Sequence, residues 1–463
     1  MSIFNDDTIA AISTPLGSAG IGKIRISGSE AIGIAGKIFK GYNKQDLKKA
    51  GGYTAHYGHI IDPENNKVAD EVICIVYRKP RSFTGEDVVE VDCHGGMMPL
   101  QRVLEILLNQ NIRLAEPGEF SKRAFLNGKI DLAQAEGIME VINSKTEKSL
   151  DVALTHLEGK LSSEIGKIKD KTIELYAHLE AAIDFPEDEI EGFKSDQIED
   201  RLYNIKNKIS ELISTSRQGK MYREGIKTVI VGKPNVGKSS LMNSLLKEKR
   251  AIVTDVPGTT RDIIEEYINI DGIPLRIIDT AGIRKTSDIV EQIGVKKAQD
   301  SLETADLVLM MIDISKGLEE DDKEIYKLIK NKPVIILMNK SDLDIDIDFD
   351  ELEDFFSQHV SIKISVKEDK GINELKKSII KEVLNEEIMS DDELFITRER
   401  HKNALDKALK AINRVLSSHR DKLPYDFYTI DMRDCLDALG EITGETLGED
   451  IVDRIFNDFC LGK

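Results

Sequence analysis

The stretch VGKPNVGKSS, residues 231–240, decides the fold of the central part of this 463-residue chain. It contains the spacing Gly232-x-x-x-x-Gly237-Lys238-Ser239, follows the apolar run KTVIV (227–231) and precedes the helix-like SLMNSLLKEK (240–249). A strand, a glycine-rich turn and a helix in this order surround a phosphate with backbone N–H groups, while the lysine meets the β- and γ-phosphates and the serine ligates Mg²⁺. The stretch predicts a P-loop that binds a nucleoside triphosphate.

Outward from this loop, apolar runs alternate with helical patterns. The runs predicted as strands are PLRIIDTAG (274–282), DLVLMMID (306–313), PVIILMNKSD (333–342) and IKISV (362–366). Strands that alternate with helices form a mostly parallel sheet covered on both faces. We therefore predict an α/β nucleotide-binding domain over residues 218–383.

The segment Asn339-Lys340-Ser341-Asp342 follows a buried strand and identifies the base. The Asp342 carboxylate can accept hydrogen bonds from the ring N–H and the exocyclic amine of guanine, which adenine does not present in this way. The turn Ser365-Val366-Lys367 follows the last strand and is expected to complete the guanine pocket. The predicted nucleotide is GTP.

Two further segments are expected near the γ-phosphate. Asp279-Thr280-Ala281-Gly282 supplies an acidic group near Mg²⁺ and a glycine N–H, and TDVPGTTRD (254–262) supplies a threonine for the Mg²⁺ shell. Ile283 stands where Ras-type enzymes have a glutamine, so another group must position the water. Asp288 and Glu291 are both candidates for accepting its proton, and their chemistry alone does not choose between them.

The flanks of this domain predict two other kinds of structure. Residues 1–119 mix β-branched runs with Gly and Pro, which indicates an α+β domain, while residues 120–217 and 384–463 are largely helical. The α/β domain is thus predicted to be inserted into one all-helical domain. An apolar stripe on one long helix is expected from Leu150, Leu154, Leu157, Leu161, Ile165, Ile168, Leu175 and Leu179.

Composition limits the function classes. A net charge of −19 argues against a surface that grips nucleic acid throughout, so any RNA contact is expected to be local. The four cysteines show no metal or disulfide spacing, and no apolar run reaches membrane-spanning length. The N-terminus lacks signal-peptide features, which favours a cytoplasmic setting. The final residues CLGK, with Lys463 last, argue against prenylation of Cys460.

Taken together, GKPNVGKSS, TDVPGTTRD and DTAGIRKTSDIVEQIGV resemble the potassium-activated, translation-factor-like GTPases. The flanking segments STPLGSAGIGKIRISG (13–28), RSFTGEDVVEVDCHGG (81–96), AEPGEFSKRAFLNGKIDLAQAEGI (115–138) and FCLGK (459–463) narrow the resemblance to one family. They look like the tRNA-uridine modification GTPases, called MnmE or TrmE, from end to end.

The resemblance implies a role for each matching residue. Glu291 matches the catalytic glutamate, which favours it over Asp288; Ser239 and Thr260 match Mg²⁺ ligands; and Asn235, with Thr254, Val256 and Thr259, matches a K⁺ site. From the residues alone, Asn235 is equally a turn residue. The predicted GTP-binding residues are Asn235, Val236, Gly237, Lys238, Ser239, Ser240, Thr254, Asp255, Val256, Pro257, Gly258, Thr259, Thr260, Asp279, Thr280, Ala281, Gly282, Asn339, Lys340, Asp342, Ser365, Val366 and Lys367.

The N-terminal part resembles a folate-binding, dimer-forming module. On that resemblance Arg25, Glu90, Lys129 and Lys463 contact 5-formyl- or 5,10-methylenetetrahydrofolate, and Cys460 is a nearby thiol. The basic side chains would neutralise the folate carboxylates, and the glutamate would accept from the pterin N–H groups.

The family further implies a homodimer that works with a FAD- and NADH-dependent partner on C5 of the wobble uridine, position 34, of certain tRNAs. Methylenetetrahydrofolate would supply the carbon, and glycine or ammonium the amino group, to give a 5-carboxymethylaminomethyl or aminomethyl product. Two alternatives remain from the sequence. A ribosome-assembly or RNA-associated GTPase should carry a compact basic domain, and a folate-dependent one-carbon transferase regulated by GTP should work without the flavoprotein.

Overall fold

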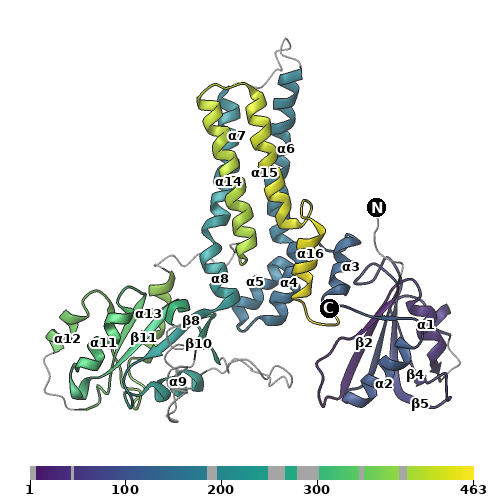
Figure 1. Ribbon diagram of the computed structural model, residues 1–463, viewed down its shortest axis with the longest axis horizontal. Helices are drawn as coiled ribbons and strands as arrows, with labels where there is room; N and C mark the ends of the chain where they lie inside the picture. Colours follow the sequence, from purple (N-terminus) through teal and green to yellow (C-terminus); the bar gives the residue numbers. More distant parts are fainter. Residues whose placement is uncertain are drawn as a thin grey trace.

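The computed structural model describes residues 7–42, 46–184, 195–248, 266–278, 302–343, 349–384 and 394–463. The structure has a seven-stranded sheet and a six-stranded sheet. Figure 1 shows an upright bundle of long helices between them. The two sheets lie on opposite sides of the base of the bundle (Figure 1).

The N-terminal sheet has the strand order β3-β4-β5-β6-β2-β1-β7 and is antiparallel except between β1 and β7. Side chains alternate across it, so Ile24 and Ile26 of β2 enter a core with helices α1 and α2, while Arg25 faces the other way opposite Glu90 of β6. This is the predicted α+β arrangement. Its elements are β1 (Ile9–Ile12), β2 (Ile21–Ser27), α1 (Ala31–Ile38), β3 (Phe39–Gly41), β4 (Thr54–Ile61), β5 (Val68–Tyr77), β6 (Val88–His94), α2 (Met97–Leu108) and β7 (Arg113–Leu114).

Helices from before and after the six-stranded sheet share one hydrophobic core. α6 and α7 precede that sheet in the chain, α14 and α15 follow it, and the four pack along one another (Figure 1). The helices of this part are α3 (Glu119–Leu126), α4 (Leu132–Asn143), α5 (Glu147–Leu157), α6 (Lys160–Asp184), α7 (Ser195–Ser214), α8 (Ser216–Glu224), α14 (Glu399–Arg420), α15 (Tyr425–Thr443) and α16 (Glu449–Asn457).

The single long helix predicted from Leu150 to Leu179 is wrong. Two helices, α5 and α6, occupy this span, and the chain turns between them at Gly159, whose φ is 81°. A residue in the left-handed region ends a helix, and glycine adopts it without a Cβ penalty. Leu154 of α5 is 37% exposed and does not extend the stripe that α6 buries.

The six-stranded sheet has the order β13-β12-β11-β8-β10-β9, with all neighbours parallel except the β9–β10 pair. Alternate residues of β11 enter two separate cores, one on each face: Leu309 and Met311 on one, Val308 and Met310 on the other. The elements are β8 (Ile226–Val231), α9 (Lys238–Glu248), β9 (Glu266–Ile270), β10 (Ile273–Ile278), β11 (Leu307–Asp313), α11 (Glu320–Ile329), β12 (Val334–Asn339), α12 (Phe349–Phe355), β13 (Val360–Lys363) and α13 (Ile372–Leu384).

Ligands of such sheets bind beyond the carboxyl ends of the parallel strands. The loop after β8 and the segment after β12 both emerge at this edge, which brings the two predicted nucleotide motifs to one place. Across the ranges that the structure describes, no helix has both the length and the apolarity needed to span a bilayer.

Candidate functional site

The loop between β8 and α9 has the backbone shape of a phosphate cradle. Gly232 and Gly237 have φ of 141° and 106°, and Asn235 between them has φ of 66°. A Cβ on Gly237 would lie 2.4 Å from Asn339 Nδ2, so a side chain at this position would displace the neighbouring loop. α9 begins directly after Gly237, and the unpaired N–H groups of its first turn therefore open toward the loop.

Lys238 lies across this loop. Its Nζ donates to the carbonyl oxygens of Gly232 and Lys233, at 2.7 Å each, and burial lowers the pKa of the ammonium. Ser239 and Ser240 are exposed on the first turn of α9, while Val236 is buried and anchors the loop. The loop and the first turn of α9 thus carry an ammonium, backbone N–H groups and an exposed hydroxyl within a few residues of one another.

Asn339 connects the phosphate cradle to the predicted guanine pocket. Its Nδ2 donates to the Val236 carbonyl at 2.7 Å, and its Oδ1 accepts from the Val366 N–H at 3.2 Å. The side chain is 4% exposed, and these two bonds fix it between the loops. Its role in the structure is to hold the loop of Ser365 to Lys367 against the cradle.

Asp342 is the hydrogen-bond acceptor of the predicted guanine pocket. Ser365 Oγ donates to Asp342 Oδ1 at 2.8 Å, and Lys367 Nζ lies 3.8 Å from Oδ2. The Ser365 hydrogen bond and the Lys367 charge hold the pKa of Asp342 below its ordinary value, so the group is an ionised acceptor. Lys340 Nζ is paired with Asp313 Oδ2 at 2.5 Å.

The remaining predicted nucleotide residues lie outside the described part of the chain. They are Thr254, Asp255, Val256, Pro257, Gly258, Thr259, Thr260, Asp279, Thr280, Ala281, Gly282, Asp288 and Glu291.

A second candidate site lies on the face of the N-terminal sheet opposite its main core, where charged side chains pair across strands. Glu90 is 8% exposed and accepts from Arg25 Nη2 at 2.9 Å and from Lys23 Nζ at 2.5 Å. Burial alone would raise the pKa of Glu90, but the hydrogen bond from Lys23 and the charge of Arg25 lower it overall. The Arg25 guanidinium also lies 5.5 Å and 5.6 Å from the ring centroids of Phe83 and Phe120.

The C-terminal residues dock beside this pair. Arg25 Nη1 donates to the Gly462 carbonyl at 3.3 Å, and the Phe120 N–H donates to Lys463 O at 3.2 Å. Gly462 has a φ of 87°, and a Cβ there would lie 2.5 Å from the Ile12 carbonyl oxygen. Burial and the nearby Arg25 charge lower the pKa of the Lys463 side chain. The structure thus brings Arg25, Glu90 and Lys463 together from opposite ends of the chain.

The other two residues of this predicted set lie close by. Lys129 Nζ donates to the Pro80 carbonyl at 3.1 Å, in the loop that also carries Phe83. Cys460 is exposed, and its carbonyl oxygen accepts from the Gly118 N–H at 3.4 Å.

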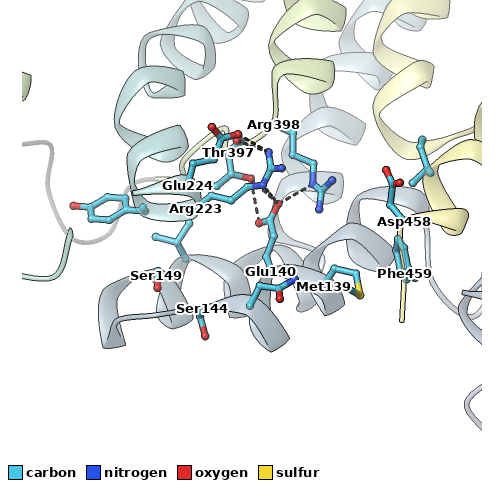
Figure 2. A pocket seen from close by; sticks show the side chains of 14 residues that line it. Met139, Glu140, Ser144, Ser149, Arg223, Glu224, Thr397, Arg398, Asp458 and Phe459 are labelled. Carbon is cyan, nitrogen blue, oxygen red and sulfur yellow. Dashed lines mark hydrogen bonds and ion pairs between the residues drawn. The ribbon is translucent and has the colours of Figure 1, made fainter. Parts of the chain in front are cut away.

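The sequence did not predict a third cluster, at the base of the bundle. A cavity of about 340 Å³ lies where α4, α5, α8 and α16 meet the start of α14. Figure 2 shows Glu140 of α4 directed toward Arg223 and Arg398, with Thr397 above it. Glu140 accepts from Arg398 Nε at 2.8 Å and from Thr397 Oγ1 at 3.0 Å.

His156 of α5 completes the contacts of Glu140. Its Nδ1 lies 3.1 Å from Glu140 Oε2, and its Nε2 donates to the Phe395 carbonyl at 2.8 Å. Burial raises the pKa of Glu140, but the His156 hydrogen bond and the charges of Arg398, His156 and Arg223 outweigh it and lower the pKa to about 2.

Glu136, one turn earlier on α4, binds the same segment. It accepts from Arg400 Nη2 and His401 Nε2, at 2.7 Å each, and Arg398 Nη1 lies 3.5 Å away. We define Glu136, Glu140, His156, Thr397, Arg398, Arg400 and His401 as the base cluster. Its signal in the sequence was two glutamates four residues apart in the otherwise uncharged LAQAEGIMEVIN (132–143) and the charged TRERH (397–401).

Family models cover most of the chain. Residues 8–129 match the one described as GTP-binding protein TrmE N-terminus, and residues 132–460 match the one described as MnmE helical domain. A protein of Acetivibrio thermocellus named tRNA modification GTPase MnmE is 50% identical over 461 residues and covers 100% of both chains. A protein of Clostridioides difficile with the same name is 48% identical over 461 residues, again covering 100% of both.

Two of the solved structures that this chain resembles match part of it. Aquifex aeolicus Era bound to GDP·AlF₄⁻ is 35% identical, covers 40% of this chain and 65% of that one, and has a TM-score of 0.28. The G domain of the Thermotoga maritima FeoB iron transporter is 29% identical, covers 34% of this chain and 98% of that one, and has a TM-score of 0.27.

Proposed function

Because this chain belongs to the family of tRNA modification GTPases named MnmE and is a GTP hydrolase, we propose that its hydrolysis of GTP serves modification of the wobble uridine, position 34, of certain tRNAs. The observation that carries the finer proposal is the convergence of Arg25, Glu90 and Lys463 on one face of the N-terminal sheet. These three charged groups come from distant parts of the chain, and the folded C-terminal residues bring the last of them beside the other two.

The described residues of the nucleotide site have different roles toward GTP. Lys238 and the N–H groups of the cradle neutralise the β- and γ-phosphates, and Asp342 selects guanine. The exposed Ser239 hydroxyl and the Asn235 carboxamide offer the oxygen donors that hard cations prefer. We propose that Ser239 and Thr260 hold Mg²⁺, and that Asn235 with Thr254, Val256 and Thr259 holds K⁺.

These cations would stabilise negative charge on the transferring phosphoryl group. Glu291 is proposed to orient the attacking water, since Ile283 cannot. We also propose that two nucleotide domains of a homodimer must meet for fast hydrolysis, and that the nucleotide domain (218–383) is inserted between the helical segments 120–217 and 384–463, after the N-terminal domain (1–119).

At the N-terminal site, Arg25, Lys129 and Lys463 are proposed to bind the carboxylates of a tetrahydrofolate, while Glu90 accepts from its pterin N–H groups. A carboxylate can accept about four hydrogen bonds, so Glu90 retains capacity beyond Lys23 and Arg25. Bound methylenetetrahydrofolate would supply one carbon, and glycine or ammonium the nitrogen. The sequence has no flavin-binding fingerprint, which supports a separate FAD- and NADH-dependent partner.

Calorimetric titration of 5-formyltetrahydrofolate into the nucleotide-free protein tests the folate site. We expect saturable binding near one site per chain, lost on Arg25→Ala and on removal of Lys463. Lys40→Ala is the matched control, because this exposed lysine lies on β3, away from the pair of Arg25 and Glu90. Absence of binding by the unmodified protein at millimolar ligand would refute the folate proposal and leave the GTPase assignment intact.

A second assay tests the cation. Hydrolysis of GTP is measured in K⁺ and in Na⁺ at equal ionic strength, with Asn235→Ala beside the unmodified protein. We expect K⁺ to accelerate GTP hydrolysis by the unmodified protein and not by the Asn235→Ala protein. Equal rates in both salts would remove the K⁺ proposal.

A further inference from the structure

Helix α5 contacts the six-stranded sheet through its N-cap residue. Thr146, the N-cap of α5, donates from Oγ1 to the Gly272 carbonyl in the β9–β10 turn at 2.6 Å. The same turn is closed by the Gly272 N–H, which donates to Asn269 Oδ1 at 2.8 Å. Thr146 is 8% exposed and also accepts from the Ser149 N–H, so one buried hydroxyl serves both the helix and the turn.

Two other contacts hold the same helix against the sheet. Lys145 Nζ lies 5.5 Å from the ring centroid of Tyr267 on β9. Val152, in the middle of α5, lies in the same hydrophobic core as Leu275 of β10 and Tyr222 of α8. The helix therefore packs on the sheet as part of its core, and close-packed interiors transmit displacement because they do not compress.

The far end of α5 reaches the base cluster. His156 joins Glu140 of α4 to the Phe395 carbonyl, and Glu140 binds Thr397 and Arg398 at the start of α14. Through one helix, the β9–β10 turn is thus connected to the first residues of the bundle. The cavity beside Glu140 leaves these side chains room to rearrange (Figure 2).

The β9–β10 turn is placed to respond to the nucleotide. β10 has six residues, so its ends lie about 17 Å apart, and it is hydrogen-bonded to β8 on one side and β9 on the other. One end is the turn held by Thr146. The other end, Ile278, directly precedes the segment 279–282 that the sequence assigns to the γ-phosphate.

We propose that α5 couples the nucleotide state of the sheet to the base of the bundle, with Thr146 as the positioning residue that holds the β9–β10 turn. A shift of β10 between the GDP and GTP states moves α5, and His156 carries that movement to Glu140 and Arg398. Thr146 touches neither the nucleotide loop nor the N-terminal site. Loss of the Thr146 hydroxyl should leave both GTP hydrolysis and tRNA modification measurable but should uncouple the second from the first. Only the measurement of tRNA modification rests on the proposed function.

The test compares Thr146→Val, which keeps the shape and removes the hydroxyl, with Thr146→Ser, which keeps the hydroxyl. Thr155→Val is the matched control, because Thr155 lies on the same helix and, among the residues that the structure describes, its Oγ1 donates within that helix, to the Val152 carbonyl at 2.7 Å. All proteins are first checked for unchanged GDP affinity and for GTP hydrolysis within about twofold of the parent, as expected for a residue outside the nucleotide loop.

The first readout is backbone hydrogen exchange of α5 and of the first turn of α14, with GDP and with a non-hydrolysable GTP analogue. The parent, Thr146→Ser and Thr155→Val should show a nucleotide-dependent difference, and Thr146→Val should lose it. A parent without such a difference, or a Thr146→Val protein that keeps it, overturns the proposal.

The second readout is tRNA modification with the flavoprotein partner and folate. GTP should accelerate modification by the parent, and Thr146→Val should lose at least about fivefold of that acceleration, the lower end of typical coupling between sites. Failure of the parent to modify tRNA would refute the proposed function alone, since the exchange experiment does not depend on it.

Discussion

Replacing Glu140 by glutamine removes a buried charge and keeps the shape of the side chain. Glu140 accepts from Thr397 and Arg398 and faces His156, and it is 7% exposed. In the Glu140→Gln protein one acceptor oxygen becomes an NH₂ donor, which then faces donors. Arg398 and Arg223 each lose one carboxylate partner, although Arg398 keeps Glu136 and Arg223 keeps Glu224.

The size of the effect follows from the pKa of Glu140, which falls from the ordinary 4.5 to about 2. Each pH unit of such a difference corresponds to about 1.4 kcal/mol, so the ionised form stabilises the fold by about 3 kcal/mol at pH 7. This agrees with the ~3–5 kcal/mol lost when one partner of a buried ion pair is removed.

The sign of the pH dependence is set by the lowered pKa. The stabilisation is fully present above the unfolded-state pKa of 4.5 and is lost as the pH falls toward about 2. Protonated glutamate resembles glutamine, so the gap between the two proteins should narrow from about 3 kcal/mol at pH 7 to about 1 kcal/mol at pH 3.

Hydrogen exchange of the α4 and α14 amides in graded urea measures the opening free energy of this region at each pH. Glu174→Gln on the exposed side of α6 is the control and should change it by less than about 0.5 kcal/mol. A gap between Glu140→Gln and the parent that is the same at pH 7 and pH 3 would refute the argument, because the loss would then not depend on ionisation.

Three further substitutions test the two candidate sites. Gly118→Ala places a Cβ 2.2 Å from the Phe456 carbonyl at a φ of 69°, so it should displace the C-terminal residues and weaken 5-formyltetrahydrofolate binding at least tenfold, measured by calorimetry. Gly237→Ala places a Cβ 2.4 Å from Asn339 Nδ2 and should lower GTP affinity by more than tenfold in equilibrium dialysis, while the melting of the bundle is unchanged. Asp342→Asn replaces one acceptor oxygen by an NH₂ donor and should lower the affinity for GTP by at least tenfold relative to xanthosine triphosphate. An unchanged preference between the two nucleotides would refute the contact assigned between Asp342 and guanine.

The sequence was sufficient for elements whose chemistry is local. The P-loop needs Gly232, Gly237 and Lys238 at fixed spacing between a strand and a helix, and each of these lies where the spacing predicted. The strands of the central sheet are continuous apolar runs, because both faces are buried, and this made them visible without any contact information.

The base cluster could not be predicted in the same way. Its glutamates lie on α4, and Arg398, which binds Glu140, is separated from that helix in the chain by the whole six-stranded sheet. The sequence alone does not show whether a charged residue in a largely apolar helix is buried, because this depends on an oppositely charged partner from elsewhere in the chain. The break at Gly159 was missed for a related reason: the apolar spacing continues across it, and only the left-handed φ shows that the helix ends.

The two segments that connect the six-stranded sheet to the helices are in backbone contact. A Cβ on Gly219 would lie 2.4 Å from the Ile396 carbonyl oxygen, and the Ile396 N–H donates to Thr215 Oγ1 at 3.0 Å. This contact bears on the order of folding. Pairing α7 with α14 requires closure of a loop that contains the entire sheet, which is entropically costly and slow while the intervening chain is unfolded.

Once the sheet has folded as a unit, the chain segments that enter and leave it are held together, and the effective loop between α7 and α14 becomes short. The bundle then assembles as if α8 were followed almost directly by α14. We therefore expect the rate at which the bundle forms to follow the folding of the nucleotide-binding sheet, and a nascent chain can pack its four long helices only after residue 443 has emerged.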